Sequence, residues 1–140
     1  MNAKSKPVRG LLLATSLLCS SYLHAYDICV DGVYYDLNGT EATVTTDGVS
    51  FDRDSGSNTY AGEVVIPSSF EYFGTTYSVV AIGDYAFEYC SNLTAVTIGS
   101  SVAAIGYGAF VECRGLTSVV LPNAVTTIDN RAFDGYSDCA

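Results

Sequence analysis

Two stretches decide the fold: IGDYAFEYCSNLTAVTIGSSVAA (82–104) and IGYGAFVECRGLTSVVLPNAVTT (105–127). The second stretch repeats the first at an offset of 23 residues, and a shorter copy, IDNRAFDGYSDCA, follows at 128–140. The opening isoleucine and the internal Ala-Phe pair recur without insertion at Ile82, Ile105 and Ile128, Ala86, Ala109 and Ala132, and Phe87, Phe110 and Phe133. A fixed period of this length indicates a solenoid, in which stacked coils bury the apolar face that no coil can bury alone.

Each full copy also contains the LxxLxL spacing of a leucine-rich repeat, at Leu93, Val96 and Ile98 and again at Leu116, Val119 and Leu121. The alternation predicts a strand whose Val96 and Ile98 point inward and whose Ala95 and Thr97 point outward. The Ile-Gly-x-x-Ala-Phe stretch is too short for a long helix, so a helical turn with alanine and phenylalanine inside is expected there. The predicted fold is mainly β with short helical turns.

The pattern IGxxAFxxCxxLTxVxIPxxVxxI resembles the BspA-type leucine-rich repeat of surface proteins from Bacteroides-like bacteria. The resemblance is clear over 82–140 and weak over 60–81, and YDICVDGVYYDLNGTEATVT, within 26–46, looks like the segment that often opens such proteins. It implies adhesion or binding, with matrix proteins among the family's partners. The third copy departs from the pattern, because Tyr136 replaces the repeat cysteine and Cys139 stands where leucine is expected.

Residues 26–81 are expected to form a β-rich N-terminal cap that includes a degenerate first repeat. Asp31-Gly32 predicts a hairpin between two apolar runs, and Glu41 to Thr46 alternates like a strand. VVIP (64–67) matches VVLP (119–122) and predicts a repeat strand. The extra residues between this strand and Ile82 predict a second hairpin that turns at Gly74.

The first 25 residues have the layout of a secretory signal peptide, with three basic residues, a short apolar run (11–18) and Ala25 at the cut. A non-cleaved anchor and a lipid attached to Cys19 are the alternatives. Export to the medium or the outer cell surface is therefore expected. Nothing in the mature chain (26–140) is apolar enough to span a bilayer.

The mature chain has three arginines, no lysine and fifteen acidic residues, a net charge of −12. Such a surface excludes nucleic acid as a partner. The only histidine, His24, lies in the leader, so no His-dependent triad exists in the mature chain. A calcium site could be considered at Asp52, Asp54 and Asn58, but their spacing is not that of an EF-hand. Neither a metal, a cofactor nor enzymatic activity is expected.

Cys90 and Cys113 occupy equivalent positions in adjacent copies. Equivalent positions in neighbouring strands lie about 4.8 Å apart, within reach of a disulfide. The alternative is two buried thiols, which is also what the family resemblance implies for this packing position.

We expect a non-catalytic binding module for an extracellular protein or glycan. The residues expected on its binding surface are Ala95, Thr97, Ser118 and Val120 on the strands and Tyr85 and Tyr107 at variable repeat positions. The alternatives are a truncated or donor copy of a longer repeat protein with a structural role only, and an accessory domain of a glycan-processing enzyme. The shortened third copy predicts an open C-terminal edge through which the chain could self-associate.

Overall fold

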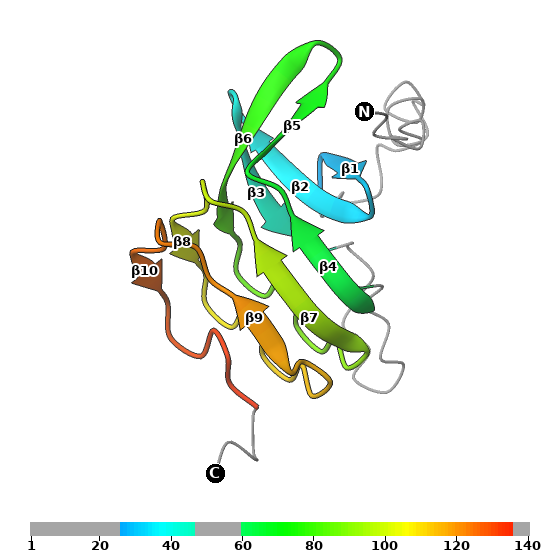
Figure 1. Cartoon of the computed structure of the whole chain (residues 1–140), viewed down its shortest axis with the longest axis vertical. Coiled ribbons are helices and arrows are strands. Elements are labelled where there is room, and N and C mark those ends of the chain that lie inside the picture. The colour runs from blue at the N-terminus through cyan, green and yellow to red at the C-terminus, as the bar shows by residue number, and fades with distance from the viewer. Residues whose placement is uncertain (1–25, 47–59, 136–140) are drawn as a thin grey trace, which may run out of the picture.

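The computed structural model of the chain describes residues 26–46 and 60–135, in which every regular element is a β-strand (Figure 1). The strands are β1 (Ile28–Val30), β2 (Val33–Asn38), β3 (Glu41–Thr45), β4 (Gly62–Ile66), β5 (Ser69–Tyr72), β6 (Thr75–Ile82), β7 (Leu93–Ile98), β8 (Ala104–Ile105), β9 (Ser118–Val120) and β10 (Thr127–Ile128). They form two sheets. A three-stranded sheet has the order β4-β7-β9, and a larger sheet has the order β1-β2-β3-β6-β8-β10, with β5 paired to β6.

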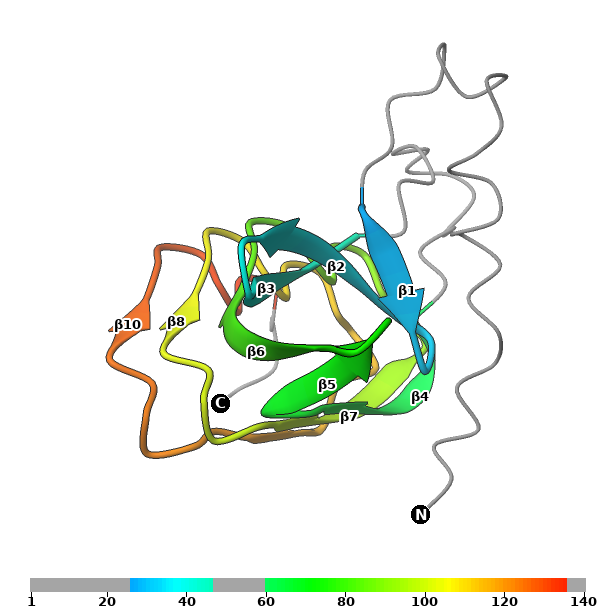
Figure 2. The ribbon, with the colours of Figure 1, turned by 90° about the horizontal axis from the view of Figure 1, so that it is seen from above.

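The repeated part winds as a solenoid, and each coil adds one parallel strand to each sheet. In the larger sheet Ile82 pairs with Ile105, which pairs with Ile128. In the smaller sheet Val96 of β7 pairs with Val119 of β9. Residues 23 apart in sequence are therefore neighbours in space, and Figure 2 shows the coils side by side. The predicted leucine-rich-repeat solenoid is confirmed.

The segment between the two sheets forms a third hydrogen-bonded side of the coil. The Phe87 N–H donates to the Ala109 carbonyl at 2.8 Å, and the Phe110 N–H donates to the Ala132 carbonyl at 2.7 Å. Hydrogen-bonded turns stand here in place of the expected helical turn, because two positions in each coil have a left-handed backbone. The first is held by Tyr85, Gly108 and Arg131, with φ of 56°, 58° and 59°, and the second by Tyr89, Glu112 and Gly135, with φ of 57°, 57° and 100°. A left-handed residue every four positions interrupts any helix.

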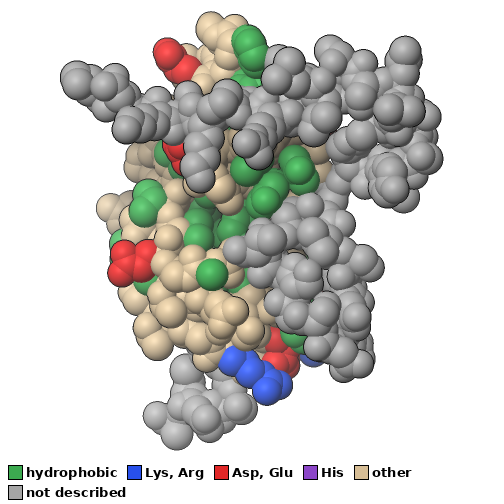
Figure 3. Space-filling model, turned by 90° about the vertical axis from the view of Figure 1, so that its right-hand side faces the viewer, with side chains coloured by type: hydrophobic (Ala, Val, Ile, Leu, Met, Phe, Trp, Pro, Cys, Tyr) green, Lys and Arg blue, Asp and Glu red, His purple; other side chains and the backbone are tan. Residues whose placement is uncertain are grey.

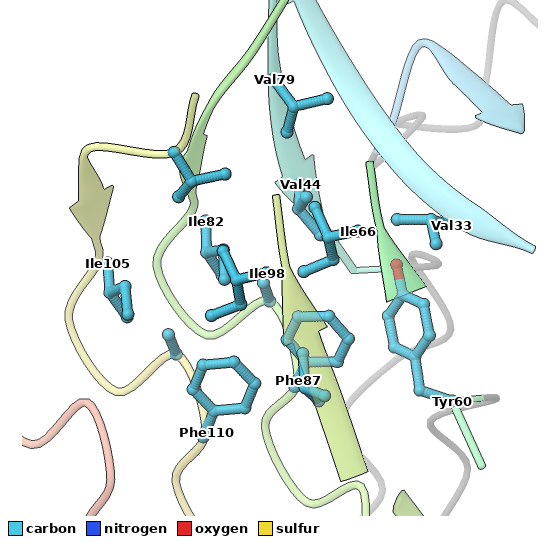
Figure 4. Packing of buried hydrophobic residues seen from close by; sticks show 14 of the residues in the cluster. Val33, Val44, Tyr60, Ile66, Val79, Ile82, Phe87, Ile98, Ile105 and Phe110 are labelled. Carbon is cyan, nitrogen blue, oxygen red and sulfur yellow. The ribbon is translucent and has the colours of Figure 1, made fainter. Parts of the chain in front are cut away.

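The core of the coils contains a column of phenylalanine rings, of which Phe87 and Phe110 are labelled in Figure 4, and the alanine before each of these phenylalanines is buried. The Phe87 and Phe110 ring centroids lie 4.9 Å apart with an angle of 4° between the planes, and Phe110 and Phe133 follow at 5.1 Å and 5°. Val96 and Ile98 are buried against this column, as the alternation predicts. The spacing of the rings equals the spacing of neighbouring strands, which is about 4.8 Å, so one aromatic position per coil builds a continuous stack.

Both hairpins predicted before the clear repeats are present. β1 and β2 pair across Asp31-Gly32, and β5 and β6 pair across Phe73-Gly74. The expected strand after Glu41 is β3, which pairs parallel with β6. β4, which contains the Val64–Ile66 part of VVIP, pairs parallel with β7 in the same sheet as the repeat strands. The expected border between residues 81 and 82 falls inside β6, because this strand belongs both to the second hairpin and to the first coil.

Tyr60 links the N-terminal strands to the first coil. Its hydroxyl donates to the Thr45 carbonyl at 2.9 Å and accepts from the Tyr34 N–H at 3.0 Å. Its ring lies 4.4 Å from the Phe87 ring, centroid to centroid, and so extends the aromatic column toward β2. Nothing in the spacing of the repeats indicated this role.

Candidate interaction surfaces

The four predicted strand residues come together on the outer face of the smaller sheet. Ala95 lies beside Ser118 and Thr97 beside Val120, because β7 and β9 are paired in register. β4 extends the same two rows with Glu63 and Val65. We call these six residues the outer strand face. They point outward because their neighbours in the alternation, such as Ile66 and Ile98, point into the core.

The outer strand face is small in side-chain volume and nearly uncharged. Val65 and Val120 are 66% and 55% exposed and flank Thr97, which is also exposed. Glu63 is the single charged residue among the six. A face of this kind offers a partner apolar contacts and hydroxyl groups, with little charge to desolvate.

Tyr85 and Tyr107 lie elsewhere, on the turn side of the coils. Their ring centroids are 5.4 Å apart in an edge-to-face arrangement. They line a shallow cavity of about 240 Å³ together with Arg131, Asp134 and Glu88. The six residues predicted as one surface therefore form two, because outward strand positions and turn positions belong to different sides of the coil.

The turn side carries an exposed ion pair. The Arg131 Nε and the Asp134 Oδ2 are 2.7 Å apart, and this contact lowers the pKa of the Asp134 carboxyl. The pKa of the Tyr85 phenol is raised, first by desolvation and then by Tyr107 and Glu88. The Tyr107 N–H donates to the Asp84 Oδ1 at 2.8 Å, which joins adjacent coils. The cluster is thus held by coil-to-coil contacts that also serve the fold.

Cys90 and Cys113 are buried thiols in the structure and lie in adjacent coils. The Cys113 Sγ donates to the Phe87 carbonyl at 2.9 Å. This arrangement corresponds to the packing alternative. A disulfide between the two stays a prediction that depends on the redox environment.

A second hollow, of about 270 Å³, lies between the β1–β2 turn and β4, with Tyr60, Val33 and Val64 in its lining. Burial raises the pKa of the Tyr60 phenol, and also that of Tyr35. At this end of the solenoid the described hydrophobic side chains gather in the middle and the charged ones lie at the margins (Figure 3).

In residues 26–46 and 60–135 no three His, Cys, Asp or Glu side chains gather as a metal site requires. Asp52, Asp54 and Asn58, the imagined calcium ligands, lie outside the described residues, as do the leader, Tyr136 and Cys139. The described part of the chain also contains no helix with the length and apolarity to cross a bilayer.

Comparison with known proteins places this architecture in a family. The family described as "BspA type Leucine rich repeat region (6 copies)" matches residues 62–140. A leucine-rich repeat protein from Bacteroides capillosus is 33% identical, with a TM-score of 0.57, and the match covers 72% of this chain and 69% of that one. No curated protein matches the chain.

Two longer structures are similar as well. The leucine-rich repeat protein of T. pallidum is 28% identical over 73% of this chain and 42% of its own length, with a TM-score of 0.57. A leucine-rich cell surface protein from Faecalibacterium prausnitzii is 28% identical over 74% of this chain and 26% of its own, with a TM-score of 0.59. The present chain thus spans less than half the length of either. The 23-residue coils, the family match over more than half of the chain and the solved relatives together show that the chain belongs to the BspA-type leucine-rich repeat family.

Proposed function

We propose that the chain is a non-catalytic interaction module outside the bacterial cell, which binds an extracellular protein or glycan through the outer strand face. The observation that carries the proposal is the register of β4, β7 and β9. It aligns Val65, Thr97 and Val120 in one row and Glu63, Ala95 and Ser118 in the next. A leucine-rich repeat family is a family of interaction modules, and on this face the paired strands of the present chain offer outward side chains to a partner.

The exposed valines support a contact role. Val65 and Val120 are both more than half exposed, at outward positions of their strands where a partner could cover them. A buried apolar side chain contributes about 1.5–3 kcal/mol relative to an exposed one, so a partner that covers both valines gains from each. The single carboxylate of the face, Glu63, leaves little charge to be desolvated.

The location outside the cell rests on two observations. The leader has the layout of a secretory signal, and the Faecalibacterium prausnitzii relative is described as a cell surface protein. Matrix proteins and mucins are accordingly the first partners to test.

The test is a binding assay of the exported protein on purified fibronectin, laminin, collagen and mucin. We expect binding to at least one, and a loss of about tenfold or more when Thr97→Arg places a charge in the middle of the outer strand face. Ser91→Arg, an exposed position on the turn side, is the matched control and should leave binding unchanged. Equal loss in both variants, or no binding across the panel, would count against the proposal.

A further inference from the structure

The tip of the β5–β6 hairpin carries a large aromatic residue where the turn favours a small polar one. Phe73 has φ of 46° and Gly74 has φ of 76°, and the Phe73 side chain is 71% exposed. A two-residue hairpin turn with positive φ at both central positions prefers Asn-Gly or Asp-Gly. A second turn of this kind among the described residues follows the preference, with Asp31 at φ of 50° and Gly32 at 82°. Tyr85 and Tyr89 also have positive φ, but they hold recurring positions of the coils, whereas Phe73 lies at a hairpin tip where the repeat does not call for a bulky residue.

The hairpin projects from the body of the molecule (Figure 1). β6 pairs with β3 only from Ser78 onward, so the ribbon beyond this residue consists of β5 and β6 alone. Within the coils, Ile105 follows Ile98 at an offset of seven positions, whereas Ile82 follows Ile66 at an offset of sixteen. The ribbon is therefore an addition to the repeat, and the stacking of the coils does not need its tip.

Aromatic contacts hold the ribbon to the core. The ring centroids of Tyr72 and Phe73 lie 4.8 Å apart, and those of Tyr72 and Tyr77 lie 6.4 Å apart. Tyr77 stacks on Phe70 at 5.5 Å, and Phe70 lies 4.6 Å from the buried Tyr35. A two-stranded ribbon is marginally stable alone. This unbroken series of rings ties the ribbon to the core, so that Phe73 stands on a packed support.

The described residues that precede the first full coil, which include the ribbon, carry charges of one sign only. Residues 26–46 and 60–81 contain six acidic residues and no lysine or arginine. One of the six, Glu71, is exposed on β5 beside the tip. A surface that accepts this ribbon must therefore tolerate or complement negative charge.

We propose that Phe73 is an anchor residue that inserts into an apolar pocket with a basic rim on a partner protein. A protruding, preorganised aromatic side chain is the kind of group that dominates interface energetics. The charge argues against two other occupants. A second copy of this acidic chain would repel the first, and an anionic bilayer would repel both. The anchor is separate from the outer strand face, and neither site requires the other.

The test uses Phe73→Asn, which restores the preferred turn residue while it removes the anchor. We expect a melting temperature equal to or above that of the wild type, since the backbone strain is relieved. The exported full chain, immobilised, is used to select from a phage-displayed library of random peptides. The expected peptides combine apolar side chains with lysine or arginine. As synthetic peptides they should bind Phe73→Asn about 30-fold more weakly than the wild type, the loss typical of an interface anchor.

Two further variants separate the anchor from the turn. Phe73→Leu should retain most of the binding because it keeps an apolar knob, and Asp31→Asn in the other hairpin should leave binding unchanged. The proposal is overturned if no selected peptide depends on Phe73, or if the peptides that depend on it carry no basic residues. It is also overturned if the tip instead binds zwitterionic phosphatidylcholine vesicles in a flotation assay and Phe73→Asn abolishes that binding.

Discussion

The first full coil (82–104) and the second (105–127) have nearly the same apolar pattern but differ in burial. Ile98 is 4% exposed, and its equivalent, Leu121, is 43% exposed. Val96 is buried, and its equivalent, Val119, is only partly buried. The strand β7 has β4 on one side and β9 on the other, whereas β9 ends the smaller sheet within the described residues.

The difference shows that burial in this fold comes from the neighbouring coil. A side chain in one coil is covered by the next coil. The same residue type therefore contributes differently to the free energy of unfolding in an inner coil and in an outer one. Matched substitutions in the inner and outer coils should therefore lower the free energy of unfolding by unequal amounts.

The largest difference is expected in the phenylalanine column. Phe110 lies between Phe87 and Phe133, with a ring on each face, and is fully buried, whereas Phe133 is partly buried. Phe110→Ala should lower the free energy of unfolding by about 3–5 kcal/mol, and Phe133→Ala by less than half as much. Urea denaturation followed by circular dichroism measures both. Equal losses of stability in Phe110→Ala and Phe133→Ala would contradict the view that the neighbouring coil provides the burial.

A smaller difference is expected on the strands. Ile98→Ala opens a cavity between coils and should cost about 2–5 kcal/mol. Leu121→Ala removes an already exposed side chain and should change stability by about 0.5 kcal/mol or less. The two variants are compared by their urea midpoints at equal m-values. A cost for Leu121→Ala close to that for Ile98→Ala would show that the outer coil is covered in solution, as self-association through the C-terminal edge would require.

The N-terminal side of the stack can be examined through its phenols. Burial raises the pKa of Tyr60 and Tyr35, so the folded chain keeps protons that the unfolded chain releases above about pH 10. The contribution of these two buried phenols to the free energy of unfolding is fully present below about pH 10. As the pH rises beyond this value, the free energy of unfolding should fall. Tyr60→Phe should cost about 1–3 kcal/mol at pH 7, because the Tyr34 N–H and the Thr45 carbonyl lose their partner, and should reduce the alkaline slope. If stability falls as steeply with alkaline pH in Tyr60→Phe as in the wild type, the buried Tyr60 phenol is not the cause of the fall.

The smallest effect concerns Cys90 and Cys113, which occupy the same position in the two coils and are almost equally buried, at 1% and 2% exposure. In residues 26–140 purified without reductant, we expect both to react with a maleimide only after unfolding. Mass spectrometry of the peptides that contain them reads the result. A disulfide-linked pair of peptides would show that the pairing alternative holds.

The sequence predicts most of the fold because its signals are periodic. The inward set of Val96, Ile98 and Phe87 follows from alternation and from the 23-residue offset, and Asp31-Gly32 follows from turn chemistry. The left-handed backbone was harder to foresee. Gly108 and Gly135 mark these positions in single coils, but Tyr85 and Arg131 adopt the same φ without such a signal.

The candidate surfaces were only half predictable. Outward strand residues could be assigned to one face from the alternation, because the pairing partner of each is known once the offset is known. The side of the coil on which Tyr85 and Tyr107 lie depends on the turn path, which no spacing fixes. Tyr60 and Phe73 lie outside the repeats, so periodicity carried no information about either.

The hydrogen bonds between successive coils have a mechanical meaning. They run along the axis of the stack, as the Phe87 N–H to Ala109 carbonyl and the Phe110 N–H to Ala132 carbonyl do. A pulling force along this axis acts on one row of these hydrogen bonds at a time. The coils should therefore detach one after another, because the rows do not break together as they would in shear. Each coil that unwinds frees 23 residues, or about 80 Å of extended chain at roughly 3.3–3.6 Å per residue. Such a stack would lengthen stepwise under load while the remaining coils stay folded.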